Sequence, residues 1–266
     1  MICTLGDLLL DVVVRLEGPI AGDTDTYGRT RVGAGGQAAN VAAWAAALDG
    51  RARFVGKRAR DPAGRFLADE LRRRGVDVAG PEVEEGTGTV VSIATPDGKR
   101  TMLTDRGVAI AFEAGELDPS WLEGCERLHV PGYSLAMPPI RHTALAAARF
   151  KPRVSVDLSS TAAIEAAGLE TFRSVLTELD ADIVFANGDE AELIGDLDVE
   201  TFVVKRGARG CVVRTRNGEQ AYPAEPAEVV DTTGAGDAFA AGFLAGGPAA
   251  AMQAAARCVS KMGAMP

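Results

Sequence analysis

One nine-residue stretch combines the residue types that can bind a phosphate group. Residues 231–239 have the sequence Asp-Thr-Thr-Gly-Ala-Gly-Asp-Ala-Phe. Residues 227–230 are typical of the end of a strand, and residues 238–244 continue at helical spacing, so the stretch is predicted to join a strand to a helix. Its two glycines allow main-chain N–H groups to point to one place, where the helix N-terminus adds about half a positive charge. This arrangement suits a phosphate.

Asp237 adds a possible chemical step to this predicted anion site. A carboxylate within an anion-binding turn repels the anion, so its presence needs an explanation. Asp237 could accept the proton of an attacking hydroxyl group while the main-chain amides stabilise a phosphoryl group in transfer. The alternative is that Asp231 and Asp237 only cap the helix, as Asp often does.

The stretch 231–239 resembles, almost residue for residue, the C-terminal signature of the PfkB (ribokinase-like) carbohydrate kinases. The resemblance implies that Asp237 is the catalytic base, and that Gly234, Ala235 and Gly236 form the anion hole for the transferred phosphate. The resemblance extends over essentially the whole chain, because two further motifs occur at earlier positions. The three motifs stand in the same order along the chain as in the family.

The first of these motifs lies in residues 33–40, Gly-Ala-Gly-Gly-Gln-Ala-Ala-Asn. The stretch also satisfies the dinucleotide fingerprint G-x-G-x-x-A, but that fingerprint should follow a buried apolar strand, and residues 27–32 are half polar. The resemblance instead implies that Gly35 and Gly36 let a substrate approach the backbone, and that Asn40 hydrogen-bonds a substrate hydroxyl. No Lys stands in this stretch, which argues against an already phosphorylated sugar as substrate.

The resemblance assigns a substrate role to a second N-terminal position. Asp11 follows Gly6 by five residues, at the end of the apolar run 2–10, which is predicted to be a buried strand. An Asp with this spacing binds substrate hydroxyls in the family. The structural alternative is a carboxylate that simply meets solvent where a core strand ends.

The second further motif concerns magnesium. Asn187 and Glu190 follow the predicted strand 182–186 and open a helix, where they could be ordinary caps. Their spacing resembles the Asn-x-x-Glu motif of the family, which implies that they organise Mg²⁺, with Glu190 acting through water. Oxygen ligands and retained water are what Mg²⁺ prefers.

The resemblance also implies an ATP site and a possible cation site. The strand–turn–strand segment 201–213 is expected to lie along the nucleotide, with Gly207 and Gly210 giving it room and Lys205 adding a charge near the phosphates. A purely structural turn is the alternative. Asp231 and Thr233 match positions that help to bind a monovalent cation in some members, so a K⁺ requirement is left open.

The arrangement of segments predicts an α/β fold. From Leu128 onward strands and helices alternate, which indicates a mostly parallel sheet flanked by helices on both faces. Four half-polar segments do not fit a buried parallel core and are predicted to form a separate small sheet; they are 12–16, 24–32, 89–94 and 99–104. The resemblance implies a single ribokinase-like domain, 1–266, with residues of about 12–32 and 88–105 as a lid over the sugar. The alternative is a surface hairpin with no role in function.

Three further residues are considered without a firm role. His129 falls in a predicted strand and is expected to be a hydrogen-bonded core residue. Asp157 ends a predicted strand at the edge where ligands gather in such sheets, but the residues after it depart from the family pattern. Arg106 lies in a segment that resembles part of the family's lid, so it could reach substrate or phosphate, or form a surface ion pair.

Composition limits the classes of partner. With 28 Lys and Arg against 37 Asp and Glu, the net charge of −9 disfavours nucleic acid and anionic membranes. The four cysteines have no metal-site spacing and are expected to be reduced and buried. No apolar run is long enough to span a membrane and Met1 is not followed by a basic segment, so a cytoplasmic protein is predicted.

These observations together predict an ATP- and Mg²⁺-dependent kinase that phosphorylates a hydroxymethyl group of a small sugar, and that forms a homodimer through its lid. A nucleoside kinase of the same fold is the runner-up, although 5% aromatic residues offer little for base stacking. A non-catalytic sugar or nucleotide sensor is the alternative of another class. The retained Asp237 argues against a sensor, which has no use for a base.

Overall fold

The large sheet of the computed structural model is built mostly from parallel strands. The model describes residues 1–97, 100–150 and 152–266, so Gly98 and Lys99 of the predicted lid hairpin lie outside the described residues. The strands of this sheet are β1 (Ile2–Leu5), β4 (Ala52–Val55), β6 (Val76–Ala79), β10 (Arg127–Pro131), β11 (Arg153–Asp157), β12 (Ile183–Ala186), β13 (Thr201–Lys205), β14 (Cys211–Thr215) and β15 (Gly218–Tyr222). Their order is β15-β14-β13-β12-β11-β10-β1-β4-β6. Only the β13-β14 and β14-β15 pairs of this order are antiparallel, which confirms the prediction of a mostly parallel sheet.

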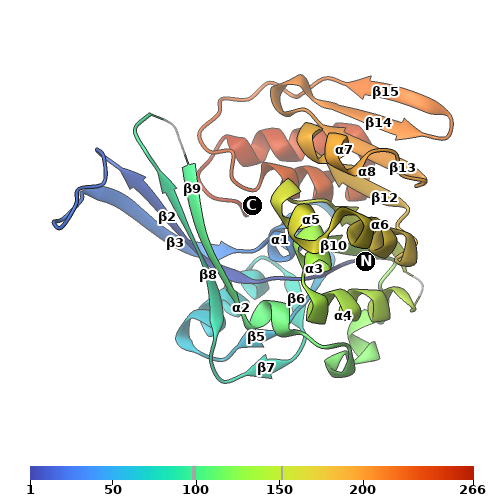
Figure 1. Cartoon of the computed structure of the whole chain (residues 1–266), viewed down its shortest axis with the longest axis horizontal. Coiled ribbons are helices and arrows are strands. Elements are labelled where there is room, and N and C mark those ends of the chain that lie inside the picture. Colours follow the sequence, from blue (N-terminus) through green and yellow to red (C-terminus); the bar gives the residue numbers. More distant parts are fainter. Residues whose placement is uncertain (98–99, 151) are drawn as a thin grey trace.

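Helices cover both faces of the large sheet (Figure 1). Strand residues alternate between two apolar cores: Phe185 belongs to one and Val184 to the other. The first core is completed by α1 (Gln37–Asp49), α2 (Pro62–Arg73) and α8 (Ala235–Val259). The second is completed by α3 (Gly132–Ala136), α4 (Pro138–Ala148), α5 (Thr161–Ala167), α6 (Leu169–Glu178) and α7 (Gly188–Ile194). In the part of the chain that the structure describes, none of the helices is long and apolar enough to cross a bilayer.

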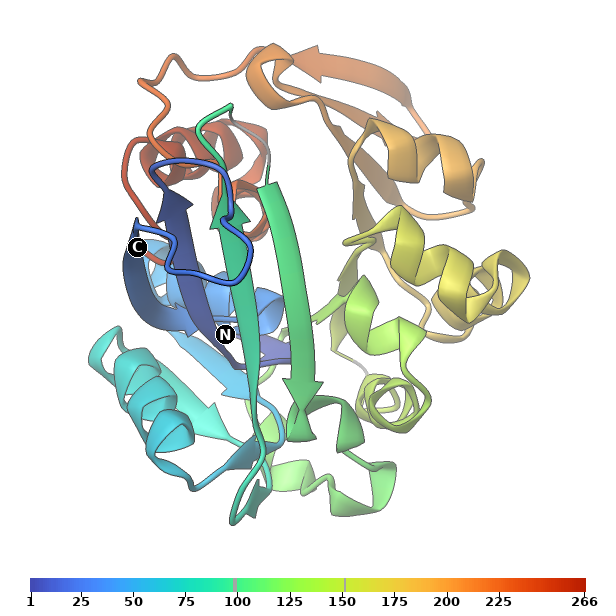
Figure 2. The ribbon, with the colours of Figure 1, turned by 60° about the vertical axis from the view of Figure 1, so that its left-hand side comes forward.

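A small four-stranded sheet projects from the body of the molecule, as Figure 1 and Figure 2 show. It consists of β2 (Leu9–Leu16), β3 (Gly28–Gly35), β8 (Thr87–Ala94) and β9 (Arg100–Gly107), in the order β3-β2-β8-β9. The inner pair β2-β8 is parallel and the two outer pairs are antiparallel. A separate small sheet was predicted from the same segments, and the structure confirms it. Short connections complete the fold: β5 (Arg58–Ala59), β7 (Glu82–Val83), and the 3-10 helices η1 (Val108–Ala111), η2 (Ala114–Glu116), η3 (Pro119–Leu122) and η4 (Gly207–Arg209).

The predicted strand 2–10 is wrong in one respect that matters for the site. The chain leaves the large sheet after Leu5 and enters the small sheet at Leu9. Gly6 lies at the break, where a Cβ atom would stand 2.8 Å from the Cβ atom of Ala38 in α1, so only glycine allows this close packing. Asp11 consequently lies within the small sheet rather than at the end of a core strand.

Two other boundaries also differ from the sequence prediction. Residues 227–230 form no strand, and Val229 and Val230 are exposed. The signature is therefore approached by an irregular segment that follows β15. The predicted C-terminal helix, 248–262, is the second half of α8, which bends at Gly246 and Gly247 and ends at Val259.

His129 is a core residue, as expected. Its imidazole is buried, and its Nδ1 lies 3.1 Å from the Oγ atom of Ser155 in the neighbouring strand. Burial lowers the pKa of His129 to about 4, so the ring is neutral at pH 7.

Candidate active site

The glycine-rich loop leads into the N-terminus of α8, which begins at Ala235. Gly234 caps the helix in a left-handed conformation, with φ of 76°, which glycine adopts without strain. Within the described residues, the main-chain N–H groups of Gly234 and Gly236 make no hydrogen bond, whereas Ala235 N, also predicted for the anion hole, donates to the Thr232 carbonyl oxygen at 3.3 Å. The loop therefore presents donors at a helix N-terminus, which is the arrangement that binds anions.

Asp237 lies in the first turn of α8 and is held by a residue from the other end of the chain. The Nδ2 atom of Asn40, in α1, donates a hydrogen bond of 2.8 Å to Asp237 Oδ2. Burial raises the pKa of Asp237 to about 8, although the hydrogen bond from Asn40 opposes the rise. A carboxyl group with its pKa near neutral pH can accept and release a proton, as a general base requires.

The predicted substrate residues lie on β2, β3 and the start of α1, and Asn40 among them contacts Asp237. The carboxylate of Asp11 lies against Gly35, since a Cβ atom on that glycine would stand 2.1 Å from Asp11 Oδ2. Gly36, with φ of 95°, caps α1, the helix that carries Asn40. Burial raises the pKa of Asp11 to about 6, and the nearby charge of Asp7 adds to the rise. The structure thus brings together all four predicted substrate residues.

A cavity of about 440 Å³ lies between the small sheet and the segment before the glycine loop. It is lined by Val13 and Arg15 of β2, by Ser92 and Ala94 of β8, and by residues 229–232. Side chains alternate along a strand, so Val13 and Arg15 lie on the same face of β2 as Asp11. The face of the small sheet that carries Asp11 is therefore turned toward the glycine loop.

Asp231 ties the glycine loop to the C-terminal segment. Its Oδ1 accepts hydrogen bonds from the N and Oγ1 atoms of Thr233, at 3.0 and 2.7 Å, and its Oδ2 accepts one of 3.1 Å from Gly263 N. Trp44 of α1 reaches the same segment by donating Nε1–H to the Ala264 carbonyl oxygen at 2.8 Å. These bonds give Asp231 and Thr233 a structural role, and the monovalent cation stays a prediction.

Asn187 and Glu190 form a reciprocal cap at the start of α7. Glu190 N donates to Asn187 Oδ1 at 2.9 Å, while Asn187 N and Nδ2 donate to the two carboxylate oxygens of Glu190 at 2.8 Å each. Both residues therefore cap the helix, and their role in binding magnesium stays a prediction. Burial raises the pKa of Glu190 and Asp157 raises it further, so this carboxylate stands in a strongly acidic neighbourhood.

The predicted nucleotide residues separate into two groups. A groove of about 660 Å³ is lined by Asn187, Lys205 and Gly207, together with Arg206, Arg209 and Arg214. Gly210 does not line it: its φ is 83°, and a Cβ atom there would stand 1.9 Å from the carbonyl oxygen of Tyr222 in β15. Gly210 therefore has a structural reason to be glycine, whatever binds in the groove.

Sequence reasoning missed an ion pair at the centre of the site. Lys205, at the end of β13, places its Nζ atom 2.5 Å from Oδ2 of Asp157, at the end of β11. Asp157 is almost completely buried. Both residues end strands of the parallel sheet at its carboxyl edge, where ligands bind in such folds, and this shared position could have indicated the pair.

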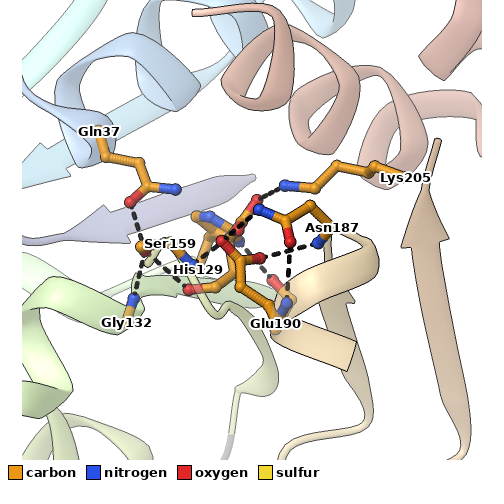
Figure 3. A network of polar contacts seen from close by, with 9 residues as sticks. Gln37, His129, Gly132, Ser159, Asn187, Glu190 and Lys205 are labelled. Atoms are coloured by element: carbon orange, nitrogen blue, oxygen red, sulfur yellow. Dashed lines mark hydrogen bonds and ion pairs between the residues drawn. The ribbon is translucent and has the colours of Figure 1, made fainter. Parts of the chain in front are cut away.

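Two polar contacts around the site were also missed. Figure 3 shows Gln37, the first residue of α1, reaching Ser159, whose Oγ atom donates to Gln37 Oε1 at 2.5 Å and accepts from Gly132 N at 2.9 Å. Ser159 has φ of 68°, an uncommon conformation for a non-glycine residue. Nothing in the local sequence indicates these contacts, because the three residues come from distant segments.

Arg106 forms an ion pair with the buried carboxylate of Asp7, and its guanidinium group lies 3.9 Å from the ring centroid of Tyr133. Asp7 also accepts a hydrogen bond of 3.3 Å from Ala38 N in the first turn of α1. The pair is thus largely buried beside the N-terminus of α1, and the surface ion pair considered from the sequence does not describe it.

A model of the pfkB family of carbohydrate kinases matches residues 1–265. The chain belongs to this family. Among its curated relatives, an ATP-dependent ribose-1-phosphate kinase from Halopiger xanaduensis is 31% identical over 256 residues, which cover 92% of this chain and 83% of the relative. A fructokinase from Salmonella typhimurium is 31% identical over 263 residues, covering 91% and 82%.

Solved structures of the pfkB fold are also similar over the full length. An adenosine kinase from Sinorhizobium meliloti superposes with a TM-score of 0.88 at 25% identity, covering 100% of this chain and 95% of that one. An uncharacterized sugar kinase from Pyrococcus horikoshii in complex with ATP shares the fold, with a TM-score of 0.88, 23% identity and the same coverage. The family and its relatives support a carbohydrate or nucleoside kinase.

Proposed function

We propose that this pfkB-family chain uses ATP to phosphorylate a hydroxymethyl group of a small sugar. The observation that carries the proposal is the contact between Asn40 and Asp237 at the N-terminus of α8. It places a half-buried carboxyl group beside the main-chain amides of Gly234 and Gly236, which have no partner in the described part of the chain. A base and an anion site in contact with each other are what phosphoryl transfer to an alcohol needs.

In the proposed reaction the ionised Asp237 accepts the proton of the acceptor hydroxyl. The hydroxyl oxygen forms the new bond to the γ-phosphorus of ATP, the bond to the bridging oxygen breaks, and ADP leaves with that electron pair. The N–H groups of Gly234 and Gly236 stabilise the negative charge on the phosphoryl group in transfer. Asn40 orients the base through Nδ2.

The other end of the Asn40 amide supports a substrate role. Its Oδ1 atom is buried and has no hydrogen-bond partner in the described residues. A buried oxygen without a partner is unfavourable, and an acceptor hydroxyl would supply the missing donor. Asp11, against Gly35, is a second group that can accept a hydrogen bond from an acceptor hydroxyl.

The groove beside β13 suits the phosphates of ATP. It is lined by Gly207 and by four basic residues, Lys205, Arg206, Arg209 and Arg214, against two acidic ones, Asp189 and Glu192, so positive charge is in excess. Magnesium would neutralise charge on the transferring phosphates when bound. Each Glu190 oxygen accepts one hydrogen bond from Asn187 and keeps a lone pair for a metal-bound water, so both residues fit a water-mediated role.

The charges around the acceptor site favour an uncharged sugar. Arg106 is paired with Asp7, and residues 33–40 contain no Lys, so neither offers a free charge for a phosphate on the acceptor. Arg15 of β2, which lines the neighbouring cavity, is the described cation that a phosphosugar would have to use. The similarity to the Sinorhizobium meliloti adenosine kinase makes a nucleoside kinase the second candidate, since ribose presents the same hydroxymethyl group. A sensor remains the alternative from another class.

A screen of ATP consumption over free sugars, phosphosugars and nucleosides tests these candidates together. Turnover with a free sugar is expected. Turnover restricted to nucleosides or to phosphosugars would replace the proposed substrate class, while no turnover with any acceptor would favour the sensor. The same screen in KCl and in tetramethylammonium chloride tests the predicted cation at Asp231 and Thr233.

We also propose that the small sheet closes over the acceptor as a lid and forms a homodimer interface. A closed lid excludes water, which would otherwise accept the phosphoryl group. Val32 of β3 and Met102 and Leu103 of β9 are exposed apolar residues on this sheet. Sedimentation of the native chain should give a dimer that Met102→Asp disrupts. Phe150→Asp, which changes an exposed apolar residue outside this sheet, is the control.

A further inference from the structure

The ion pair between Lys205 and Asp157 joins two strands of the large sheet that are not neighbours. The strand order β13-β12-β11 places one whole strand between their main chains, which corresponds to a separation of roughly 10 Å. The lysine side chain spans this gap, because its Nζ atom lies 2.5 Å from Asp157 Oδ2. Figure 3 shows it extended toward the centre of the polar network beside Asn187 and Glu190.

The ammonium group of Lys205 also lies against the glycine loop. A Cβ atom on Gly236 would have Lys205 Nζ as its nearest neighbour, at 3.3 Å. The φ angle of Gly236 is not in the left-handed region, so the backbone does not require glycine there. The close approach of the ammonium group gives a different reason for its small size.

Three carboxyl groups act on this one ammonium group. Burial lowers the pKa of Lys205, but Asp157, Glu190 and Asp237 raise it more, so the pKa is above its ordinary value and the group stays charged. Asp157 alone contacts it directly. Without Asp157, a flexible four-carbon side chain could turn into the groove beside β13 that Lys205 lines.

We propose that Asp157 is a positioning residue for phosphoryl transfer, because it holds the Lys205 ammonium group against Gly236, where that group can bind the oxygen atoms of the phosphoryl group in transfer. This inference rests on the proposed kinase function. Lys205 is then the charged part of the anion hole, and the amides of the loop are its neutral part. Gly236 is small because the two parts meet there.

A double-mutant cycle tests the proposal. Lys205→Met should lower kcat by about 10², the loss typical of one oxyanion-hole donor, with a smaller change in KM for ATP. Asp157→Asn should lower kcat by about tenfold, but in the Lys205→Met background it should change kcat by less than about twofold, because Asp157 acts through Lys205. Equal losses in both backgrounds would overturn the proposal.

Gly236→Ala gives an independent measurement that does not remove a charge from the interior. The added methyl group should displace the ammonium group and lower kcat in the native background, and should have a smaller effect in the Lys205→Ala background, where no long side chain reaches Gly236. An equal loss of kcat in both backgrounds would show that contact with the Lys205 ammonium group is not the reason why residue 236 is glycine. This variant tests the place of the Lys205 ammonium group against Gly236, on which the proposal depends, even if Asp157→Asn, which leaves a buried charge unpaired, does not fold.

Asp182→Asn is the matched control. Asp182 forms ion pairs with Arg127 at 2.8 Å and with Arg153 at 2.6 Å at the opposite edge of the same sheet, so it tests the loss of ion pairs without touching the site. Its kcat should stay within about twofold of the native value; a loss like that of Asp157→Asn would point to general destabilisation and overturn the proposal. Absence of turnover by the native chain with every acceptor would refute the kinase function, whereas turnover with additive losses would refute this inference alone.

Discussion

The amide of Asn40 and the carboxylate of Asp237 are 2.8 Å apart, although 197 positions separate them in the chain. Asn40 lies in the first turns of α1 and Asp237 in the first turn of α8, so the contact joins the N-termini of two helices on the same face of the sheet. Asn40 has an acceptor oxygen left for a substrate, and Asp237 has a pKa near neutrality. The contact therefore sets both the position and the protonation of the proposed base.

Replacing Asp237 by Asn should lower turnover by at least about 10², because a general base contributes that much or more. ATP binding should persist, since the loop amides and the groove beside β13 are unchanged. Steady-state rates and calorimetric titration with ATP measure the two effects separately. Native turnover in this variant would remove Asp237 from the mechanism.

The kcat/KM of the native chain should rise with pH and level off above about pH 8. Burial raises the pKa of Asp237 to about 8, and the reaction needs its ionised form. Asp157 and Asp7 also raise this pKa, while Lys205 lowers it, and Cys258 lies nearby. A pH–rate profile checks the expectation, and a rise complete by pH 5 would contradict it.

Asn40→Ala should move the same profile to higher pH. The hydrogen bond from Asn40 lowers the pKa of Asp237, so its loss makes the carboxyl group harder to ionise. The KM for the acceptor should also increase, because Asn40 Oδ1 is lost. An unshifted profile with a raised KM would leave Asn40 as a substrate ligand only.

Gly234→Ala should destabilise the fold more than Gly50→Ala. The two glycines have nearly the same backbone angles, with φ of 76° and 75°, so alanine costs about 1–2 kcal/mol of unfolding free energy at either. Gly50 has open space around it, whereas a Cβ atom on Gly234 would stand 2.5 Å from the Cβ atom of Ala264. Chemical denaturation should therefore separate the variants, and equal losses would argue against the contact with Ala264.

Acid should destabilise the native chain partly through His129. Its folded pKa of about 4 lies below the ordinary value of 6.5, so its contribution is present above pH 6.5 and is lost as the pH falls toward 4. The loss should approach about 3 kcal/mol. Urea unfolding at pH 7 and pH 4.5 should show a smaller difference for His129→Gln than for the native chain, with His142→Gln as the control at an exposed histidine.

The sequence predicted the parts of the site that lie within continuous motifs. The stretch 231–239 indicated the anion loop and Asp237, and residues 33–40 indicated the glycines and Asn40, because each motif needs only local backbone geometry. The alternation of segments predicted the large sheet, and half-polar segments predicted the small one. The cytoplasmic location and the dimer stay predictions.

Contacts between distant segments could not be predicted in this way. Asp11 was placed at the end of a core strand, since an apolar run does not reveal that Gly6 lets the chain turn into a second sheet. The pairing of Lys205 with Asp157 depends on strand order, which one sequence does not specify. The strand expected at 227–230 is missing, because a β-like composition forms no strand without a neighbour to pair with.

The bonds that Gly263 and Ala264 make to Asp231 and Trp44 have a consequence for synthesis in the cell. During synthesis, these bonds cannot stabilise the glycine loop until Gly263 and Ala264 have left the ribosome. Incomplete or C-terminally truncated chains should therefore hydrolyse no nucleotide. ATP is then not consumed by chains that cannot complete the transfer.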